Sequence, residues 1–179
     1  MDETEIKILN ININTIKSKL KTLGAKQTYK GLVTINFFDF EDQKISKSKS
    51  ILRLRKYGNT VEITHKTKRK NKGKFKVREE TETKVSDFGS TKKIFKKIGL
   101  KCINECEKIR TSYVLGKVKI ELDQHPKIPA YMEIEGKPKD IEKLVKKLGF
   151  EMDDTCNLTS SMVLKKYGAN QKNLKFKHR

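Results

Sequence analysis

The chain has 179 residues, which suits one domain of ordinary size, and a formal net charge of +20 at pH 7. Hydrophobic residues make up 35%, so a core can form only if helices and strands each bury one face. The excess of bases favours a polyanionic partner such as nucleic acid, an acidic membrane or polyphosphate. A chain that carries lysine on every surface would have the same charge, so charge alone does not identify the partner.

The cysteine pattern and the hydropathy pattern exclude several classes. Three cysteines without a second closely spaced pair or a nearby histidine argue against a secreted disulfide framework and against a zinc site. The sequence contains no apolar run long enough to span a membrane, and its acidic start differs from the basic start of a signal peptide. We therefore expect a cytoplasmic monomer or homodimer with no membrane partner and no specific nucleic-acid partner.

The first half of the chain predicts mainly strands. A strand over 3–9 is followed by an amphipathic helix over 16–24, where apolar residues recur at helical spacing before Gly24. The period then changes to two, which is typical of strands, over 33–39, 51–57, 60–66 and 74–82. Gly58-Asn59 marks a hairpin turn, and residues 68–73 predict a polar loop.

The second half of the chain predicts further amphipathic helices and period-two strands. A helix over 92–99 has Ser86 or Asp87 as its predicted N-cap, and strands follow over 107–115, 117–123 and 130–135. Pro138 opens a third helix over 141–149, which Gly149 ends. Residues 168–179 are basic and aperiodic and predict a flexible tail. Nothing in residues 1–167 has the composition of a linker, so we expect one domain.

Charged residues occupy alternate positions of the predicted strands. An antiparallel sheet with one solvated face would give the same alternation. However, the chain has only six arginines against 36 lysines, and four of the six stand in these rows. Guanidinium binds two phosphate oxygens in a planar fork, so the choice of arginine favours phosphate recognition. The bases of these rows are Lys7, Arg53, Arg55, Lys66, Arg78, Lys108 and Arg110.

Acidic residues form a second set of alternating rows. Glu3 and Glu5 are two apart near the start of the chain, Glu133 and Glu135 are two apart near its end, and Asp123 stands on the strand between. Carboxylates held close together repel unless a cation lies between them. Mg2+ binds through a few carboxylates together with substrate phosphates. The acidic and basic rows therefore predict a joint site for a metal ion and a polyphosphate.

At these residues the chain resembles the CYTH family, also called triphosphate tunnel metalloenzymes. The matching segments are Glu3-Thr4-Glu5-Ile6-Lys7, Asn36-Phe37-Phe38-Asp39, Leu52-Arg53-Leu54-Arg55, Thr64-His65-Lys66, Arg78-Glu79-Glu80, Lys108-Ile109-Arg110, Glu121-Leu122-Asp123 and Glu133-Ile134-Glu135-Gly136. The sequence departs from the family at Ser160-Ser161-Met162, where Lys or Ser followed by Tyr is common, and at Phe37, where Tyr is common. The stretch over 129–136 and the Leu-Gly helix ends look closest to the class IV adenylyl cyclase-like and thiamine triphosphatase-like branch.

The resemblance implies an α+β fold over residues 1–167, a closed eight-stranded antiparallel β-barrel with helices packed outside. It implies that the seven bases named above bind a triphosphate such as ATP, thiamine triphosphate or tripolyphosphate. It also implies that Glu3, Glu5, Asp123, Glu133 and Glu135 hold one or two Mg2+ or Mn2+ ions. Glu80 and Glu121 are weaker candidates for the same role.

The reaction stays open at the level of sequence. Water as nucleophile would make the protein a triphosphatase, whereas a ribose 3′-hydroxyl would make it an adenylyl cyclase that releases cyclic AMP and pyrophosphate. We favour hydrolysis, with the cyclase as the alternative and a non-catalytic polyphosphate- or nucleic-acid-binding protein as the second alternative. Neither His65, expected on the surface, nor His125, expected in a turn, is predicted to act in catalysis.

Overall fold

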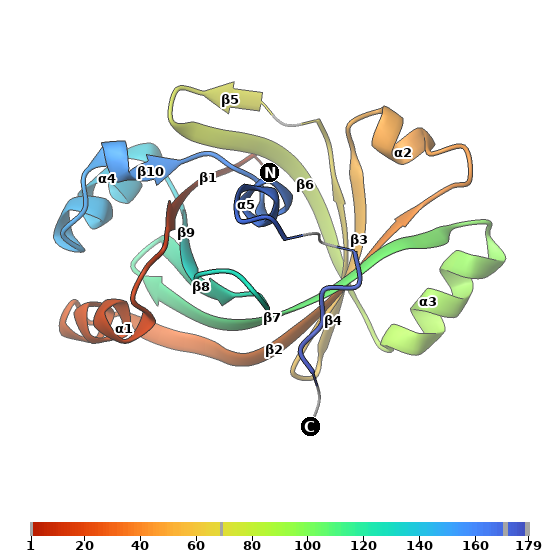
Figure 1. Cartoon of the computed structure of the whole chain (residues 1–179), viewed down its shortest axis with the longest axis horizontal. Coiled ribbons are helices and arrows are strands. Elements are labelled where there is room, and N and C mark those ends of the chain that lie inside the picture. The colour runs from red at the N-terminus through yellow and green to blue at the C-terminus, as the bar shows by residue number, and fades with distance from the viewer. Residues whose placement is uncertain (1, 69, 170–171, 178–179) are drawn as a thin grey trace.

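Eight antiparallel strands close into a barrel in the computed structural model, which describes residues 2–68, 70–169 and 172–177 (Figure 1). Pairing of β6 with β1 closes the ring, which confirms the predicted fold. Around the barrel the strands are β1 (Asp2–Leu9), β9 (Tyr131–Glu135), β8 (Val118–Gln124), β7 (Lys101–Leu115), β2 (Lys26–Asp39), β3 (Ile51–Tyr57), β4 (Thr60–Lys66) and β6 (Phe75–Val85). Two short strands extend the pairing outside the ring, β5 (Lys70–Lys72) on β6 and β10 (Thr155–Cys156) on β1.

Three helices correspond to the three predicted amphipathic segments. They are α1 (Ile13–Thr22), α3 (Phe88–Lys97) and α4 (Pro138–Lys147). The side chains of Asn12 and Asp87 accept hydrogen bonds from the first turns of α1 and α3, as N-caps do. Two shorter helices, α2 (Lys44–Lys47) and α5 (Ser160–Lys166), and a 3-10 turn (Met152–Asp154) were not predicted. None of the described helices is long and apolar enough to cross a membrane.

Apolar strand residues face the helices and form the core outside the barrel. Ile6, Ile120 and Ile134 are fully buried against α1 and α4, whose own buried residues include Leu20 and Ile141. On the other side, the ring of Phe95 from α3 packs edge-on against Phe38 of β2, with centroids 4.9 Å apart. Because side chains alternate along a strand, the charged rows on the opposite face are turned into the barrel.

Strands β2 and β7 are longer than their sequences predict. They pair with each other almost from end to end, from Lys26 opposite Val114 to Asp39 opposite Lys101. Two register shifts, between Gln27 and Tyr29 and between Phe37 and Phe38, interrupt the alternation. The added length depends on hydrogen bonds to a distant strand rather than on local propensity, so a pattern of period two does not show it.

The C-terminal segment closes one end of the barrel. Helix α5 lies across the opening in Figure 1, and its Val163 and Leu164 are buried together with Val33 of β2. Farther along, Leu174 forms a parallel bridge with Cys106, and its carbonyl accepts a 2.8 Å hydrogen bond from the Glu107 amide. The sequence predicts a flexible tail over 168–179, of which residues 170–171 and 178–179 lie outside the described residues; within the described part, Leu174, Lys175 and Phe176 contact β7.

Candidate functional site

The barrel encloses two adjoining cavities. The first, which we call the central chamber, has a volume of about 240 Å³ and extends to Thr159, Ser160 and Ser161 at the start of α5. The second, the tyrosine mouth, has a volume of about 320 Å³ and contains Tyr29 and Tyr57. Five residues line both cavities, and they are Arg55, Glu82, Arg110, Lys119 and Glu121. The interior is therefore one passage with two chemically different parts.

Arginines of β3 crowd together in the chamber. Arg53 and Arg55 stand two apart and point inward, and among the described residues the buried Nε atom of each has no hydrogen-bond partner. Burial, together with the nearby charges of Arg55 and Arg110, lowers the pKa of Arg53 to about 10. Unpaired buried donors and mutually repelling cations are both destabilising. An anion in the chamber would relieve both.

Asp123 ties two more bases together. It is completely buried on β8 and accepts three hydrogen bonds, one of 2.6 Å from Lys108 and two of 2.7 Å from Arg110. Burial by itself would raise the pKa of Asp123, but Arg110 and Lys108 outweigh it and hold that pKa below its usual value. Arg110 also pairs with Glu121. The carboxylate thus fixes the positions of two bases that line the chamber.

Lys7 is a buried base between two acids, the reverse of the arrangement around Asp123. Its ammonium is 1% exposed and lies 2.6 Å from Glu5 and 2.5 Å from Glu133. Burial acts to lower the pKa of Lys7, but the charges of Glu133 and Glu5 raise it above its usual value. Both carboxylates line the chamber, whereas Lys7 does not.

Acidic side chains gather on the wall formed by β1, β9 and β8. In the strand register Glu5 of β1 lies opposite Glu135 of β9, and Glu121 of β8 lies opposite Glu133 of β9. Burial raises the pKa of Glu121, and the neighbouring charges of Glu133 and Asp123 raise it further against the pull of Arg110. Glu135 lies 3.0 Å from Lys119. This wall carries several carboxylates that a cation would stabilise.

The predicted metal ligands form no complete cage. Within the described residues, no group of three or more His, Cys, Asp or Glu side chains is arranged to hold a metal ion. The side chain of Glu3 lies outside the described residues, and Asp123 is bound by Lys108 and Arg110. Mg2+ commonly uses only one or two carboxylates and takes its remaining ligands from substrate phosphates and water, so Glu5, Glu133 and Glu135 fit that role.

Most of the predicted site residues come together in the chamber. It is lined by the bases Arg53, Arg55, Lys66, Arg78, Lys108 and Arg110, the acids Glu5, Glu133 and Glu135, and the weaker candidates Glu80 and Glu121. Lys7 and Asp123 lie behind the lining. Glu62, which binds Arg55 at 2.7 Å, was missed, although its alternation with Lys66 on β4 points to the same face. Tyr29 was missed because it adjoins a register shift of β2, whereas Tyr57 was missed although it continues the alternation of Arg53 and Arg55 on β3.

Neither of the two histidines considered is placed for catalysis. His65 is exposed, in agreement with its predicted surface position. His125 lies between the end of β8 and the turn at Pro126, and it is 3% exposed, with Nδ1 3.0 Å from the Glu107 carbonyl and Nε2 3.3 Å from the Tyr131 hydroxyl. Burial and the charge of Lys108 lower the pKa of His125 to about 4, which keeps the ring neutral. Its contacts hold β7 and β9 near Ser160, to which Tyr131 donates a 3.3 Å hydrogen bond.

A closed antiparallel barrel with inward arginines on one wall and inward carboxylates on another defines a tunnel-type β-barrel protein with a charged interior. The CYTH domain matches residues 1–158, and the chain belongs to the CYTH family. This agrees with the resemblance seen in the sequence.

The alignments to similar proteins extend over almost the whole chain. A Methanocaldococcus jannaschii protein named "Putative adenylate cyclase MJ0240" is 28% identical over 168 residues, which are 93% of this chain and 95% of that protein. A Vibrio parahaemolyticus structure, also described as a putative adenylate cyclase, has a TM-score of 0.79 at 15% identity and covers 91% of this chain and 97% of its own. The structure of a Hippeastrum protein, described as a "Putative adenylyl cyclase" that "reveals a dominant triphophatase activity", has a TM-score of 0.68 at 16% identity and covers 93% of this chain and 96% of its own. The two structures share the fold.

Proposed function

We propose that the chain is a metal-dependent enzyme that binds a triphosphate in the central chamber and hydrolyses it to release phosphate. The observation that carries this proposal is the arginine cluster. Arg53 and Arg55 have buried Nε donors without a partner among the described residues, and Arg110 adds a third charge close enough to lower the pKa of Arg53. A linear polyanion is the ligand that supplies several negative charges along such a row.

The bases bind the phosphates in this proposal. Arg53 and Arg55 lie along β3, while Lys108 and Arg110 lie along β7, so the two pairs contact a chain of phosphates from different sides. Because Lys108 and Arg110 are buried, their ion pairs are stronger than they would be in water. Each guanidinium is already positioned before the ligand arrives, which lowers the cost of reorganisation during the reaction.

The acids provide the place for a divalent metal. Glu5, Glu133 and Glu135 stand on the wall opposite the arginines and project into the same chamber. A bound Mg2+ or Mn2+ would offset the charge that develops on the phosphate oxygens and help to activate water. The CYTH family is a family of metal-dependent triphosphate-tunnel proteins, which supports this assignment.

Adenylyl cyclase activity is the second candidate. The relative that is 28% identical over nearly the whole chain is named "Putative adenylate cyclase MJ0240", and a cyclase would bind the triphosphate through the same bases. The Hippeastrum protein has the same fold and is described as a "Putative adenylyl cyclase" with a dominant triphosphatase activity, so cyclase naming and hydrolysis occur together in one such protein. We therefore place hydrolysis first.

The purified chain, supplied with Mg2+ or Mn2+, tests the proposal when tripolyphosphate, ATP and thiamine triphosphate are offered separately. We expect release of orthophosphate that stops in excess chelator and returns with added metal. Cyclic AMP and pyrophosphate as main products from ATP would establish the second candidate instead. Tight binding of all three ligands without turnover would make the chain a non-catalytic polyphosphate-binding protein.

A further inference from the structure

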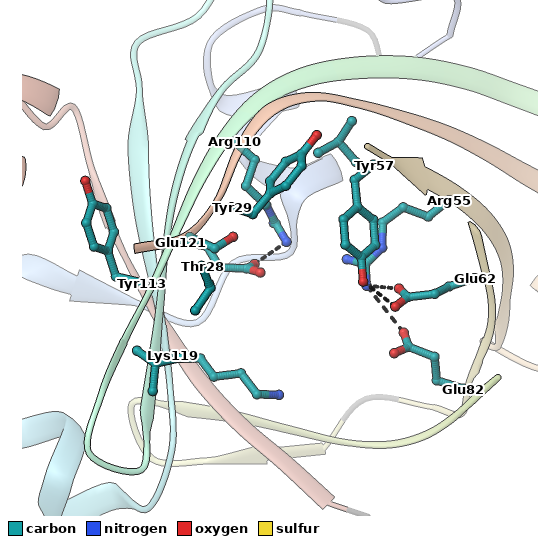
Figure 2. A pocket seen from close by; sticks show the side chains of 13 residues that line it. Thr28, Tyr29, Arg55, Tyr57, Glu62, Glu82, Arg110, Tyr113, Lys119 and Glu121 are labelled. Carbon is teal, nitrogen blue, oxygen red and sulfur yellow. Dashed lines mark hydrogen bonds and ion pairs between the residues drawn. The ribbon is translucent and has the colours of Figure 1, made fainter. Parts of the chain in front are cut away.

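Ser160 lines the central chamber but is held differently from the arginines around it. Figure 2 shows Arg55 and Arg110 on different sides of the passage. Each is paired with a carboxylate of the neighbouring barrel strand, Glu62 and Glu121 respectively. Ser160 is the first residue of α5, and it follows residue 158, where the match to the CYTH domain ends. Its place in the chamber therefore depends on how α5 is held against the barrel.

A chain of buried polar groups leads from Ser160 to β7. The hydroxyl of Tyr131, which is completely buried, donates a 3.3 Å hydrogen bond to Ser160 Oγ. The same hydroxyl lies 3.3 Å from Nε2 of His125, whose Nδ1 lies 3.0 Å from the Glu107 carbonyl. His125 is 3% exposed and Glu107 is 5% exposed. Each group therefore depends on its neighbour in the chain, rather than on bulk water, for a hydrogen bond.

The hydrogens of this chain have two arrangements. A carbonyl only accepts, so Nδ1 of the neutral His125 ring carries the hydrogen and Nε2 is an acceptor. Tyr131 thus has one hydrogen and two acceptors, Nε2 and Ser160 Oγ. When that hydrogen points to Ser160, the hydrogen of Ser160 itself is free to point into the chamber. Because an ionised phosphate oxygen also only accepts, a bound triphosphate favours this arrangement.

The far end of the chain is bound by the C-terminal segment. The Glu107 amide donates a 2.8 Å hydrogen bond to the Leu174 carbonyl, and Glu107 Oε2 accepts a 3.0 Å hydrogen bond from the Phe176 amide. Leu174 is 6% exposed and belongs to the same apolar cluster as Tyr131 and the buried residues of α5. Residues 172–177 thus join the β7 end of the chain to the cluster that holds α5.

We propose that Ser160 donates a hydrogen bond to the phosphates in the chamber and that the C-terminal segment, residues 172–177, positions it through Glu107. This rests on the proposed function, since it assigns the phosphates to the chamber. Glu107 is a positioning residue, because it lies outside the lining of both cavities and acts through His125 and Tyr131. Docking of the segment and binding of the triphosphate stabilise each other, since coupling between two sites is reciprocal.

A double-mutant cycle between the chamber and the segment tests this inference. Calorimetry with tripolyphosphate and Mg2+ measures Kd for Ser160→Ala, for Leu174→Ser and for the two changes combined. We expect Ser160→Ala to weaken binding about tenfold, as loss of a hydrogen bond to a charged group does. We expect Leu174→Ser to weaken it about fivefold and to add nothing to Ser160→Ala, because the segment acts through Ser160. Lys177→Ala, at an exposed residue of the same segment, is the control and is expected to leave Kd unchanged.

The reverse direction of the coupling is a second measurement, which does not depend on the folding of Leu174→Ser. Trypsin cleaves after Lys172 and Lys175 within the segment. Saturating tripolyphosphate with Mg2+ is expected to slow this cleavage about fivefold in the parent and to leave it unchanged in Ser160→Ala.

Three results overturn the inference while leaving the proposed function in place. They are an unchanged Kd in Ser160→Ala, losses that add in the double variant, and equal protection of the segment in Ser160→Ala and the parent. Absence of tripolyphosphate binding in the parent overturns both the inference and the proposed function.

Discussion

Lys7 and Asp123 are both buried between two residues of opposite charge, Lys7 between two acids and Asp123 between two bases. Lys7 is 1% exposed and lies between two carboxylates, whereas Asp123 is 0% exposed and lies between Lys108 and Arg110. In each cluster the central residue lies behind the chamber wall and its two partners line the chamber. We propose that each central charge holds a pair of opposite sign in place, the carboxylate pair for the metal ion and the basic pair for the phosphates.

Removal of Asp123 is expected to have the largest effect. Asp123→Asn leaves Lys108 and Arg110 buried without their common carboxylate, and breaking a buried ion pair in this way costs roughly 3–5 kcal/mol. We expect a fall of that size in the free energy of unfolding, measured with denaturant, and tripolyphosphate without metal to restore part of it. Asp153→Asn, at an exposed pair with Lys74, is the control and is expected to change little. Stability equal to that of the parent would remove the positioning role of Asp123.

Lys7→Met is expected to have the next largest effect. It leaves Glu5 and Glu133 close together without the ammonium between them, at a cost of roughly 3 kcal/mol. Glu133 is 15% exposed and can gain some hydration, so this loss is expected to be smaller than that for Asp123→Asn.

Thermal melting of both variants with Mg2+ alone and with tripolyphosphate alone sharpens the comparison. Mg2+ is expected to stabilise Lys7→Met more than Asp123→Asn, because the cation replaces the missing ammonium, and tripolyphosphate is expected to do the reverse. The same response of both variants to both ligands would mean that the two clusters are not specialised.

Arg55→Ala tests whether the arginines of β3 bind the triphosphate. Charge-assisted hydrogen bonds contribute about 1.5–3 kcal/mol, so a roughly tenfold or larger loss of kcat/KM for the triphosphate is expected. Lys147→Ala, on the exposed face of α4, removes the same charge elsewhere and is expected to leave the rate unchanged. Similar losses in the two variants would show that bulk charge rather than a defined site binds the ligand.

Glu105 forms an outer cluster that contrasts with the two buried ones. It binds Lys175 at 2.6 Å and also pairs with Lys92, and these two bases lower the pKa of Glu105 to about 2. Because that pKa lies below the unfolded value of 4.5, the stabilisation is complete above pH 4.5 and is lost as the pH falls toward 2.

Glu105→Gln is therefore expected to lower the Tm only modestly at pH 7, by at most about 4 °C, because partly exposed ion pairs contribute ~0–1 kcal/mol. Melting curves of variant and parent between pH 7 and pH 3 are expected to converge as the solution becomes more acidic. A difference that grows toward low pH would contradict the assigned ion pairs.

The sequence predicted which strand faces carry charge because alternation is a local property. Arg53 and Arg55 were placed on one face by their spacing, and the structure puts both in the chamber. It did not show how deep each charge lies, since the spacing of Lys7 and Asp123 resembles that of residues that line the chamber. Glu5 lies on the same strand as Lys7, but Glu133 and the two partners of Asp123 come from neighbouring strands, and the register of the closed barrel brings them together.

Features that depend on distant contacts were also beyond the sequence. Residues 172–177 have no pattern of their own, but Leu174 finds an unpaired edge of β7 beyond the end of β8. The position of Tyr29 follows a register shift between Gln27 and Tyr29, which depends on the pairing of β2 with β7. Period and composition report neither of these.

Thermal melting with tripolyphosphate and Mg2+, compared with orthophosphate at matched ionic strength, tests the central claim most directly. A ligand that binds only the closed barrel stabilises it by about 2.7 kcal/mol at a hundredfold excess over its Kd, which corresponds to several degrees at roughly 2–4 °C per kcal/mol. We predict this rise in Tm for tripolyphosphate, a much smaller one for orthophosphate, and loss of the difference in Arg53→Gln/Arg55→Gln. Equal stabilisation by both anions, or an unchanged response of the double variant, would contradict a triphosphate site in the barrel.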